Sequence, residues 1–279
     1  MLNLNEIRII RDSKYSAPLG LAIDEAILIS VGNEIAPNTV RFYYFENPSV
    51  VVGINQDVNS INFDFIKKTK MDFGRRLTGG GTIIIGCPNY QAQMGVSFIF
   101  KLAPDLPQKL SHKFQFFSKI IIQTLEKLGL QPNYEKNSDI TINGKKIVGN
   151  GLYISDNSLL FHSMLLFDYD FETMINVLKF DDDSLKNILI SKMKDSITTL
   201  NKELHKNIPP RSIENIIIEC IKSQWNLKIY EGEILEYERK LADKLLKEKY
   251  SNEIWNLQTF EEKKIIDACF VPFKSPIDE

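Results

Sequence analysis

Three consecutive glycines, Gly79, Gly80 and Gly81, follow the pair Arg75-Arg76 with two residues between. A run of glycines costs backbone entropy and supplies no side chains for packing. It is therefore expected where the chain must bend sharply or where a ligand must touch backbone amides. Because two arginines flank the run, we expect that ligand to be anionic. The segment predicts a binding loop rather than part of a helix or strand.

A second informative segment is a predicted hairpin around Asn143-Gly144, about sixty residues further on. Asn-Gly between two apolar runs is the strongest short-range hairpin signal. With these two residues as the turn, the pairs outward from it are Ile142–Lys145, Thr141–Lys146 and Ile140–Ile147. Since neighbouring strand residues point to opposite faces, only one of Lys145 and Lys146 can face a given pocket.

The remaining periodicity predicts an α+β fold. Apolar residues recur at helical spacing over 19–31, where Gly32 ends the pattern, and over 110–128, before Gly129. Strand-like segments, rich in β-branched and aromatic residues, cover 40–45, 49–53, 82–85, 96–100, 140–142 and 146–148. The strands at 40–45 and 49–53 are expected to be joined by a tight connection at Asn47-Pro48. From about residue 171 the pattern is mainly helical. We therefore predict a mixed or antiparallel sheet with helices packed against it, without the regular alternation of a doubly wound fold.

Composition narrows the class of protein. The chain has 279 residues, of which 43% are hydrophobic and 25% charged, as expected of a globular protein with one sizeable domain. A formal net charge of -2 gives no electrostatic argument for a nucleic-acid or membrane partner. No apolar stretch reaches the length of a bilayer span, and the first residues lack a signal-peptide pattern. We expect a cytoplasmic protein.

Cysteine usage supports neither a disulfide framework nor a zinc site. Cys87, Cys220 and Cys269 form an odd set without metal-type spacing, and the chain has three histidines.

Several stretches, taken in order, resemble the lipoate-protein ligase family, which shares a fold group with biotin ligases and octanoyltransferases. An ordered set of this kind is far more specific than any one motif. The matching stretches are 21–26 (LAIDEA), 52–56 (VGINQ), 75–82 (RRLTGGGT), 138–150 (SDITINGKKIVGN), 161–166 (FHSMLL) and 249–256 (KYSNEIWN). The resemblance therefore extends over most of the chain and implies a biotin/lipoate ligase-like catalytic domain.

The resemblance implies an ATP-dependent reaction in two steps. Lipoate is activated to lipoyl-AMP with release of pyrophosphate, and the lipoyl group then passes to a lysine of an acceptor protein. The implied acceptors are the glycine-cleavage carrier protein or a 2-oxoacid dehydrogenase acyltransferase subunit. Residues 1–256 would form the catalytic domain and 257–279 a tail, without the small C-terminal domain of many relatives. The chain thus resembles the large subunit of a split ligase, which implies a separate small accessory subunit.

The family pattern also assigns site residues. Lys146 is the predicted catalytic residue, reaching the carbonyl and phosphate of the acyl-adenylate. Asp139 is the predicted partner of a phosphate-bound Mg²⁺, because Mg²⁺ is usually held by one or two carboxylates together with phosphate oxygens. The residues predicted to bind substrate or adenylate are Arg75, Arg76, Thr78, Gly79, Gly80, Gly81, Thr82, Asp139, Gly149, Asn150 and His162.

The chain departs from the family pattern at three places. Ile85 stands where many relatives carry histidine, and Ser138 replaces the usual asparagine before Asp139. The His-His-Gly-Thr pattern reads Phe-His-Ser-Met at 161–164. These changes lie around the expected pocket wall, so they bear on acyl-chain preference more than on the reaction.

Two alternative functions remain open. An octanoyl- or lipoyltransferase of the same fold would pass the acyl group through a cysteine thioester without ATP. Residues 130–144 and 147–174, where such a nucleophile is expected, contain no cysteine, so Cys87 alone could substitute. The other alternative is a non-catalytic module that binds lipoyl domains. Lys146 and Asp139 argue against it, because a binder has little need to neutralise a phosphate.

Overall fold

A computed structural model describes residues 6–11, 14–135, 139–180, 184–225 and 227–258. Ser138, Cys269 and most of the predicted tail lie outside these ranges. The larger sheet has eight strands in the order β11-β1-β2-β6-β10-β9-β8-β7. Its strands are β1 (Glu6–Arg11), β2 (Asn38–Tyr43), β6 (Gln93–Lys101), β7 (Pro132–Tyr134), β8 (Ile140–Ile142), β9 (Lys145–Ile154), β10 (Ser158–Leu166) and β11 (Lys228–Glu231). The sheet is mixed, because β1 runs parallel to both β2 and β11 whereas β2, β6, β10, β9, β8 and β7 pair antiparallel.

A second, three-stranded sheet carries the glycine run between two of its strands. Its order is β4-β3-β5, with β3 (Ser49–Val52) parallel to β4 (Asp72–Arg75) and antiparallel to β5 (Ile83–Ile85). The strands predicted at 40–45 and 49–53 are joined by the expected short connection at Asn47-Pro48, but they belong to different sheets. The chain leaves the large sheet after β2 and starts the small one at β3, where β4 and β5 supply its partners.

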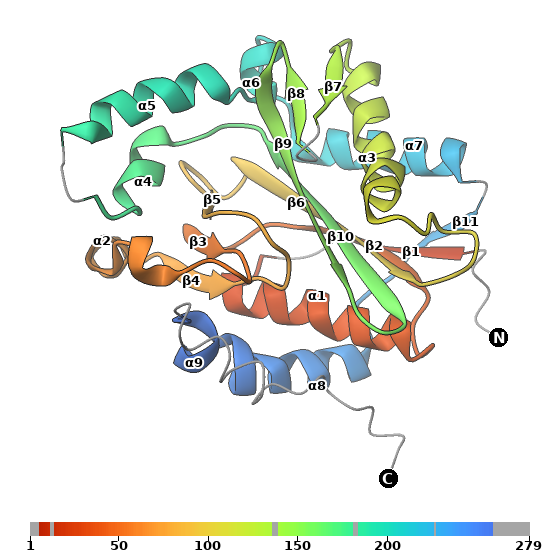
Figure 1. The fold of residues 1–279 in the computed structure, drawn as a ribbon. Coiled ribbons are helices and arrows are strands. Elements are labelled where there is room, and N and C mark those ends of the chain that lie inside the picture. The colour runs from red at the N-terminus through yellow and green to blue at the C-terminus, as the bar shows by residue number, and fades with distance from the viewer. Residues whose placement is uncertain (1–5, 12–13, 136–138, 181–183, 226, 259–279) are drawn as a thin grey trace.

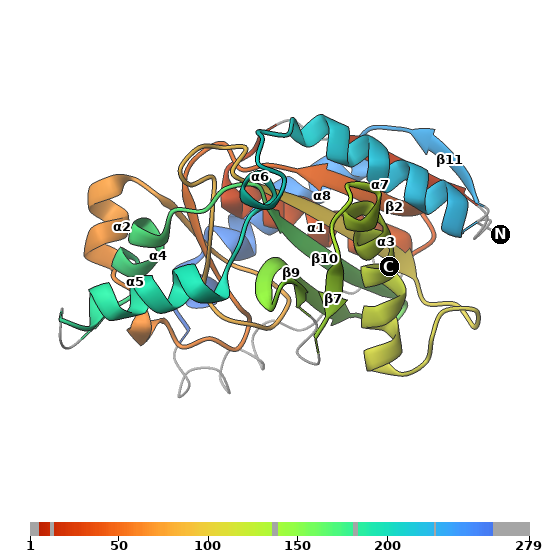
Figure 2. The ribbon, with the colours of Figure 1, turned by 90° about the horizontal axis from the view of Figure 1, so that it is seen from above.

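Helices cover both faces of the large sheet (Figure 1). The helices of the described residues are α1 (Ala17–Gly32), η1 (Val58–Ser60), α2 (Phe63–Thr69), α3 (Leu110–Lys127), α4 (Phe171–Asn176), α5 (Leu185–Ser196), α6 (Leu200–Glu203), α7 (Pro210–Gln224), α8 (Glu236–Leu245), η2 (Leu246–Tyr250) and α9 (Glu253–Asn256), and some of them pack on the small sheet instead. The view from above shows α3 and α7 side by side on one face of the sheet (Figure 2). The α+β prediction is confirmed, and so are the helices predicted to end at Gly32 and before Gly129.

Strand alternation divides the core between the two faces. Val40 and Phe42 of β2 belong to the cluster that α3 and α7 cover, whereas Tyr43 faces the cluster that contains α1 and α8. Arg41 lies between Val40 and Phe42 in the strand and points to the opposite face. It is fully buried and reaches α1, where its Nη1 lies 2.6 Å from Asp24 Oδ1. Asp24 thus fixes the first helix against the sheet.

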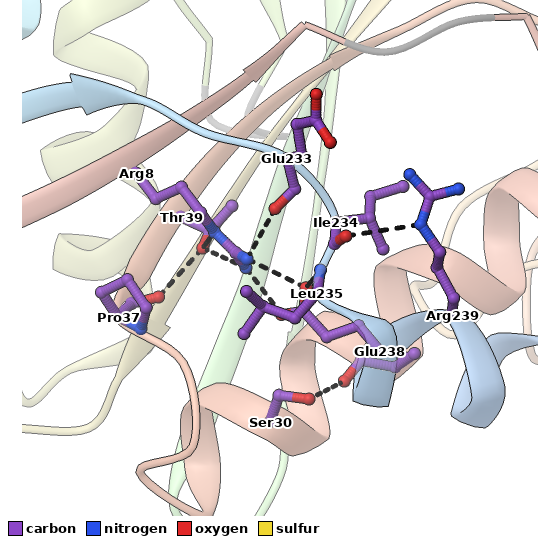
Figure 3. A network of polar contacts seen from close by, with 10 residues as sticks. Arg8, Ser30, Pro37, Thr39, Glu233, Ile234, Leu235, Glu238 and Arg239 are labelled. Atoms are coloured by element: carbon purple, nitrogen blue, oxygen red, sulfur yellow. Dashed lines mark hydrogen bonds and ion pairs between the residues drawn. The ribbon is translucent and has the colours of Figure 1, made fainter.

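The last helices are tied to the first strand by a buried ion pair (Figure 3). Arg8 of β1 donates to both carboxylate oxygens of Glu238 in α8, at 2.9 and 2.6 Å. The same guanidinium donates to Thr39 Oγ1 and to the carbonyl oxygen of Glu233. Buried charges persist only when they are paired and hydrogen-bonded, and both conditions hold here. The pair holds α8 beneath the sheet.

The hairpin between β8 and β9 has the turn that the sequence predicts. Asn143 and Gly144 both have positive φ, 51° and 74°, as a two-residue type I′ turn requires. Lys145 pairs with Ile142 and Lys146 with Thr141, also as predicted. The next predicted pair is wrong. A register shift places Ile140 opposite Val148 rather than Ile147, because a β-bulge adds one residue to β9.

No helix in the described ranges is long and apolar enough to cross a membrane.

Candidate functional site

A cavity of about 420 Å³ lies between the glycine run, the small sheet and strands β9 and β10. Its lining has a polar part, which includes exposed backbone at glycines, and an apolar part. The polar lining comprises Arg76, Gly79, Gly80, Gly81, Thr82, Asp139, Lys146, Gly149, Asn150 and His162. The apolar lining comprises Leu21, Tyr43, Phe45, Val51, Ile83, Ile84, Ile85, Met164, Leu166, Tyr169, Met174, Met193 and Ile197. The cavity therefore suits a ligand with an anionic end and a hydrocarbon end.

Arg76 shapes the glycine loop from within. Its Nη2 donates to the carbonyl oxygens of Gly79 at 2.7 Å and Gly81 at 2.9 Å, and its Nη1 donates to that of Val51 at 3.1 Å. The three glycines are exposed, and Gly80 has φ of +98°, which a residue with a side chain rarely adopts. Within the described structure, the amides of Gly79, Gly80 and Gly81 donate no hydrogen bond. Such amides are suited to bind an anion.

Arg75 does not line the cavity. Its side chain is 0% exposed and donates to the carbonyl oxygens of residues 53, 54, 56, 255, 256 and 258. The prediction that Arg75 contacts the adenylate therefore finds no support in the geometry. The strand alternates at this point, so that Arg75 points toward the C-terminal segment while Arg76 points toward the glycine loop.

Both arginines are buried cations that lack a hydrogen-bonded carboxylate among the described residues. Burial is the main cause that lowers the pKa of each guanidinium to about 10, and for Arg76 the charge of Arg75 contributes to the lowering. Both groups stay charged at neutral pH. The buried positive charge of Arg76, which lines the cavity beneath the glycine loop, favours an anion there.

His162 and Thr78 form a hydrogen-bonded pair beside Arg76. Thr78 Oγ1 lies 2.9 Å from His162 Nε2 and accepts from Arg76 Nε at 3.2 Å. Burial and the charge of Arg76 lower the pKa of His162 to about 3, so the imidazole is neutral. A Cβ at Gly151 would lie 2.5 Å from His162 Nε2, so glycine is required there. Sequence analysis did not single out Gly151, because its role appears only when β9 pairs with β10.

Lys146 reaches the cavity from β9. Its Nζ lies 2.8 Å from Asp139 Oδ1, with the side chain of Lys146 39% exposed and that of Asp139 18% exposed. A Cβ at Gly149 would lie 3.1 Å from the Lys146 Nζ, so this glycine leaves room for the ammonium group. Lys145 points away, and its Nζ lies 3.4 Å from the carbonyl oxygen of Lys194. The predicted division between the two lysines is confirmed.

Two further predicted residues stand at the rim in fixed positions. Asn150 accepts from Ser163 Oγ at 2.6 Å and donates to Ser118 Oγ at 3.3 Å. Thr82 accepts a short hydrogen bond from Gln56 Nε2. Both side chains are thereby oriented before any ligand arrives.

The apolar lining was largely missed from the sequence. Met164 comes from β10, Met174 from α4 and Met193 from α5, three elements that meet only in the folded chain. Methionine at helical spacing indicates packing but does not identify what the side chain packs against. Only the contacts between elements reveal that these three side chains share a cavity.

Carboxylate and thiol groups are few among the described residues around the cavity. No cluster of three histidine, cysteine, aspartate or glutamate residues there could hold a metal ion. Among the described lining residues, Asp139 is the one carboxylate. Cys87 is buried outside the cavity lining, and burial raises the pKa of its thiol to about 11. A thiol with so high a pKa is a poor nucleophile.

A family model and curated relatives place the chain in one protein family. Residues 16–222 match the family model described as the lipoyl protein ligase A/B catalytic domain. Octanoyltransferase LipM of Clostridioides difficile is 24% identical over 274 residues, covering 91% of this chain and 99% of the relative. Lipoate–protein ligase 1 of Staphylococcus aureus is 26% identical over 262 residues, covering 92% of this chain and 76% of the relative.

Solved structures share the fold. A bipartite lipoate protein ligase from Thermoplasma acidophilum superimposes with a TM-score of 0.79 at 23% identity, over 91% of this chain and 96% of that one. A lipoate-protein ligase A bound with ATP gives a TM-score of 0.76 at 22% identity, over 90% of this chain and 98% of that one. The similarity extends along nearly the whole chain.

Proposed function

Because the chain belongs to the lipoyl protein ligase A/B catalytic-domain family, we propose that it is an ATP-dependent lipoate-protein ligase. The family makes it an enzyme of lipoyl or octanoyl transfer, which leaves the non-catalytic binding module without support. In the proposed reaction the substrates are lipoate, ATP and a lysine of an acceptor domain. The products are the lipoylated lysine, AMP and pyrophosphate.

The observation that carries the proposal is the pairing of Lys146 and Asp139 beside the glycine loop. In the first step a carboxylate oxygen of lipoate bonds to the α-phosphorus of ATP, and the bond from that phosphorus to the bridging oxygen of pyrophosphate breaks. Two anions must approach each other, so catalysis consists mainly of positioning and charge neutralisation. Lys146 supplies a cation at the cavity, and Arg76 supplies another beneath the loop.

In the second step the acceptor amine attacks the acyl carbonyl, the amide bond forms, AMP leaves with the carbonyl–phosphate oxygen, and the amine loses a proton. Lys146 would neutralise the charge that develops on the carbonyl and the phosphate. The exposed amides of Gly79, Gly80 and Gly81 would hold the adenylate. The apolar lining would bury the hydrocarbon chain of lipoate, which accounts for the two kinds of wall in one cavity.

The cavity could hold Mg²⁺ through one protein carboxylate, that of Asp139. Mg²⁺ needs few protein ligands when phosphates and water complete its octahedron, and the Asp139 carboxylate could supply one. The ion would neutralise phosphate charge and orient the phosphates. Asp139 would then have two roles, one toward the metal and one toward Lys146.

The second candidate is an octanoyl- or lipoyltransferase that uses a cysteine thioester. What favours it is the similarity to octanoyltransferase LipM along 99% of that relative. What disfavours it is the position of the described cysteines. Cys220 is buried in α7, and Cys87, with its raised pKa, is absent from the cavity lining. A Cys87→Ala variant that keeps full activity would eliminate Cys87 as the nucleophile.

We further propose that residues 1–256 are the catalytic domain, 257–279 a tail, and that a small accessory subunit acts with the chain. The similarity to a bipartite ligase over 96% of that chain supports this arrangement. The Thermoplasma ligase has an E2 lipoyl domain as its partner, which makes a 2-oxoacid dehydrogenase acyltransferase subunit a suitable acceptor to test. The glycine-cleavage carrier protein is the other.

The decisive experiment measures lipoate-dependent pyrophosphate release from ATP, with and without an accessory subunit. Mass spectrometry of an acceptor lipoyl domain follows. ATP-dependent gain of a lipoyl mass is the expected result. Acyl transfer from a pre-acylated carrier protein without ATP consumption would instead identify a transferase.

A further inference from the structure

The segment from Lys249 to Gln258 contacts the support of the glycine loop, although it lies beyond the residues that match the family model. Arg75 Nε donates to the Trp255 carbonyl oxygen at 3.0 Å, and Nη2 donates to those of Asn256 at 3.1 Å and Gln258 at 3.3 Å. The backbone of Arg75 is engaged as well. Its carbonyl accepts from Trp255 Nε1 at 3.0 Å, and its amide donates to Asn256 Oδ1 at 3.1 Å.

The other side of the same guanidinium holds the loop after β3. Arg75 Nη1 donates to the carbonyl oxygens of Gly53 at 2.8 Å, Ile54 at 3.3 Å and Gln56 at 2.7 Å. One planar group therefore joins residues 53–56 to residues 255–258. A lysine could not do the same, because it has a single nitrogen and no planar array of donors.

Residues 53–56 in turn hold the glycine loop. The Ile54 amide donates to the Thr78 carbonyl oxygen at 3.0 Å, and Gln56 Nε2 donates to Thr82 Oγ1. Gly53 packs directly beneath the loop, since a Cβ there would lie 2.1 Å from the Gly80 carbonyl oxygen. A displacement of residues 53–56 would therefore change the shape of the cavity wall that presents the exposed glycine amides.

The C-terminal segment is itself anchored on α1. Lys249 Nζ lies 2.8 Å from Glu25 Oε1, and the Tyr250 hydroxyl donates to Glu25 Oε2 at 2.6 Å. Asn256 Nδ2 donates to the Tyr250 carbonyl oxygen at 2.7 Å, and the Lys249 ammonium lies 4.2 Å from the centre of the Trp255 ring. The segment is thus a fixed support, attached to a core helix, rather than a loose end.

We propose that Arg75 and Trp255 are positioning residues that hold the glycine loop in the shape that binds the acyl-adenylate. Residues 249–258 are then part of the catalytic machinery through this support. The identity of the ligand, an acyl-adenylate, rests on the proposed function. The route from the C-terminal segment through Arg75 and residues 53–56 to Gly80 rests on the contacts alone.

The test uses Trp255→Phe, which removes the Nε1 donor but keeps an aromatic ring in place. Asn256→Ala is a second variant should the first fold poorly. The matched control is Glu238→Gln, which weakens the buried partner of Arg8 and also loosens the C-terminal region, but lies outside the route to the loop. Thermal unfolding is measured for all three variants. Lipoate-dependent ATP–pyrophosphate exchange then gives KM and kcat.

We expect Trp255→Phe and Asn256→Ala to raise the KM for ATP about tenfold, with a smaller change in kcat, because the ground-state binding surface is displaced. Glu238→Gln should lower the melting temperature at least as much without that rise in KM. Equal rises in KM in the control and the test variants, or none in either test variant, would overturn the proposal.

Failure of the ligase assignment can be distinguished from failure of the positioning role. If the wild-type chain shows no ATP–pyrophosphate exchange, the ligase assignment fails, and the same variants are compared in acyl transfer from a pre-acylated carrier. A raised KM for the acyl donor, confined to the Trp255 and Asn256 variants, would still support the positioning role. An unchanged KM there would overturn it.

Discussion

The polar and the apolar lining of the cavity differ in how firmly the fold holds them. Arg76, Asn150 and His162 each hydrogen-bond to groups on the large sheet or at or next to the glycines of the loop. The apolar lining, in contrast, depends in part on α4 and α5, and α5 has no fully buried residue. The polar lining is therefore preorganised, whereas the part of the apolar lining that α5 contributes can change at smaller cost to stability.

Removal of the Lys146 ammonium tests the polar lining most directly. Lys146→Ala should lower the rate of adenylate formation by at least about a hundredfold, because the charge that neutralises the reacting anions is lost. The measurement is pyrophosphate exchange on a variant whose circular dichroism is unchanged. Lys145→Ala is the matched control, since the neighbouring lysine points away from the cavity. Normal turnover in folded Lys146→Ala would refute the assignment.

Neutralising Asp139 should have a smaller effect. We expect Asp139→Asn to slow adenylate formation roughly tenfold and to raise the Mg²⁺ concentration needed for half-maximal rate, because a charge-assisted contact and a metal ligand are lost together. A titration of Mg²⁺ at saturating ATP measures this shift. If the Mg²⁺ dependence is unchanged, Asp139 acts on Lys146 alone.

A change in the apolar lining should alter selectivity and leave the chemistry intact. Met193→Ala is expected to raise the KM for lipoate about threefold to tenfold with kcat nearly unchanged, because apolar contact with the acyl chain is lost. Ile188→Ala, on the same helix but 54% exposed and outside the cavity lining, is the control. A large fall in kcat for Met193→Ala would show that the two linings are not separable.

The last prediction concerns the acid stability of the fold, through His162, rather than the reaction. Its pKa is lowered from 6.5 to about 3, so between these values the unfolded chain binds a proton that the folded chain does not. Stability therefore falls as pH decreases from about 6.5 toward 3, with a limiting contribution of about 1.4 kcal/mol per pH unit. Denaturant unfolding of His162→Gln should show a weaker acid dependence than the wild type. Identical acid slopes would mean that His162 is protonated in the folded protein.

The features predicted well from the sequence are set by residues close together in the chain. The helix ends at Gly32 and before Gly129, and the turn at Asn143-Gly144, depend on residues that are neighbours in the chain. The grouping of Lys146 with the glycine loop was reached through the ordered motifs of a family. Neither inference needed knowledge of long-range packing.

What the sequence could not predict depends on partners far away in the chain. The parallel edge pair of β1 and β11 joins residues about 220 positions apart, and neither strand carries a distinctive pattern. The bulge in β9 adds one residue that alternation cannot reveal. Arg75 and Arg76 look equivalent as neighbouring arginines, and only the position of the C-terminal segment shows that one is a structural support.

The buried Arg8–Glu238 pair has a consequence for synthesis of the protein. Because its two members are 230 positions apart, the first strand cannot make this contact until almost the entire chain has left the ribosome. Until then β1 lacks both its buried counter-charge and its neighbour β11. Contacts of such long sequence separation slow folding and prolong the time during which unpaired strand edges can aggregate. In the nascent chain, the edge of β1 should therefore stay open to chaperones until residues 228–238 have emerged.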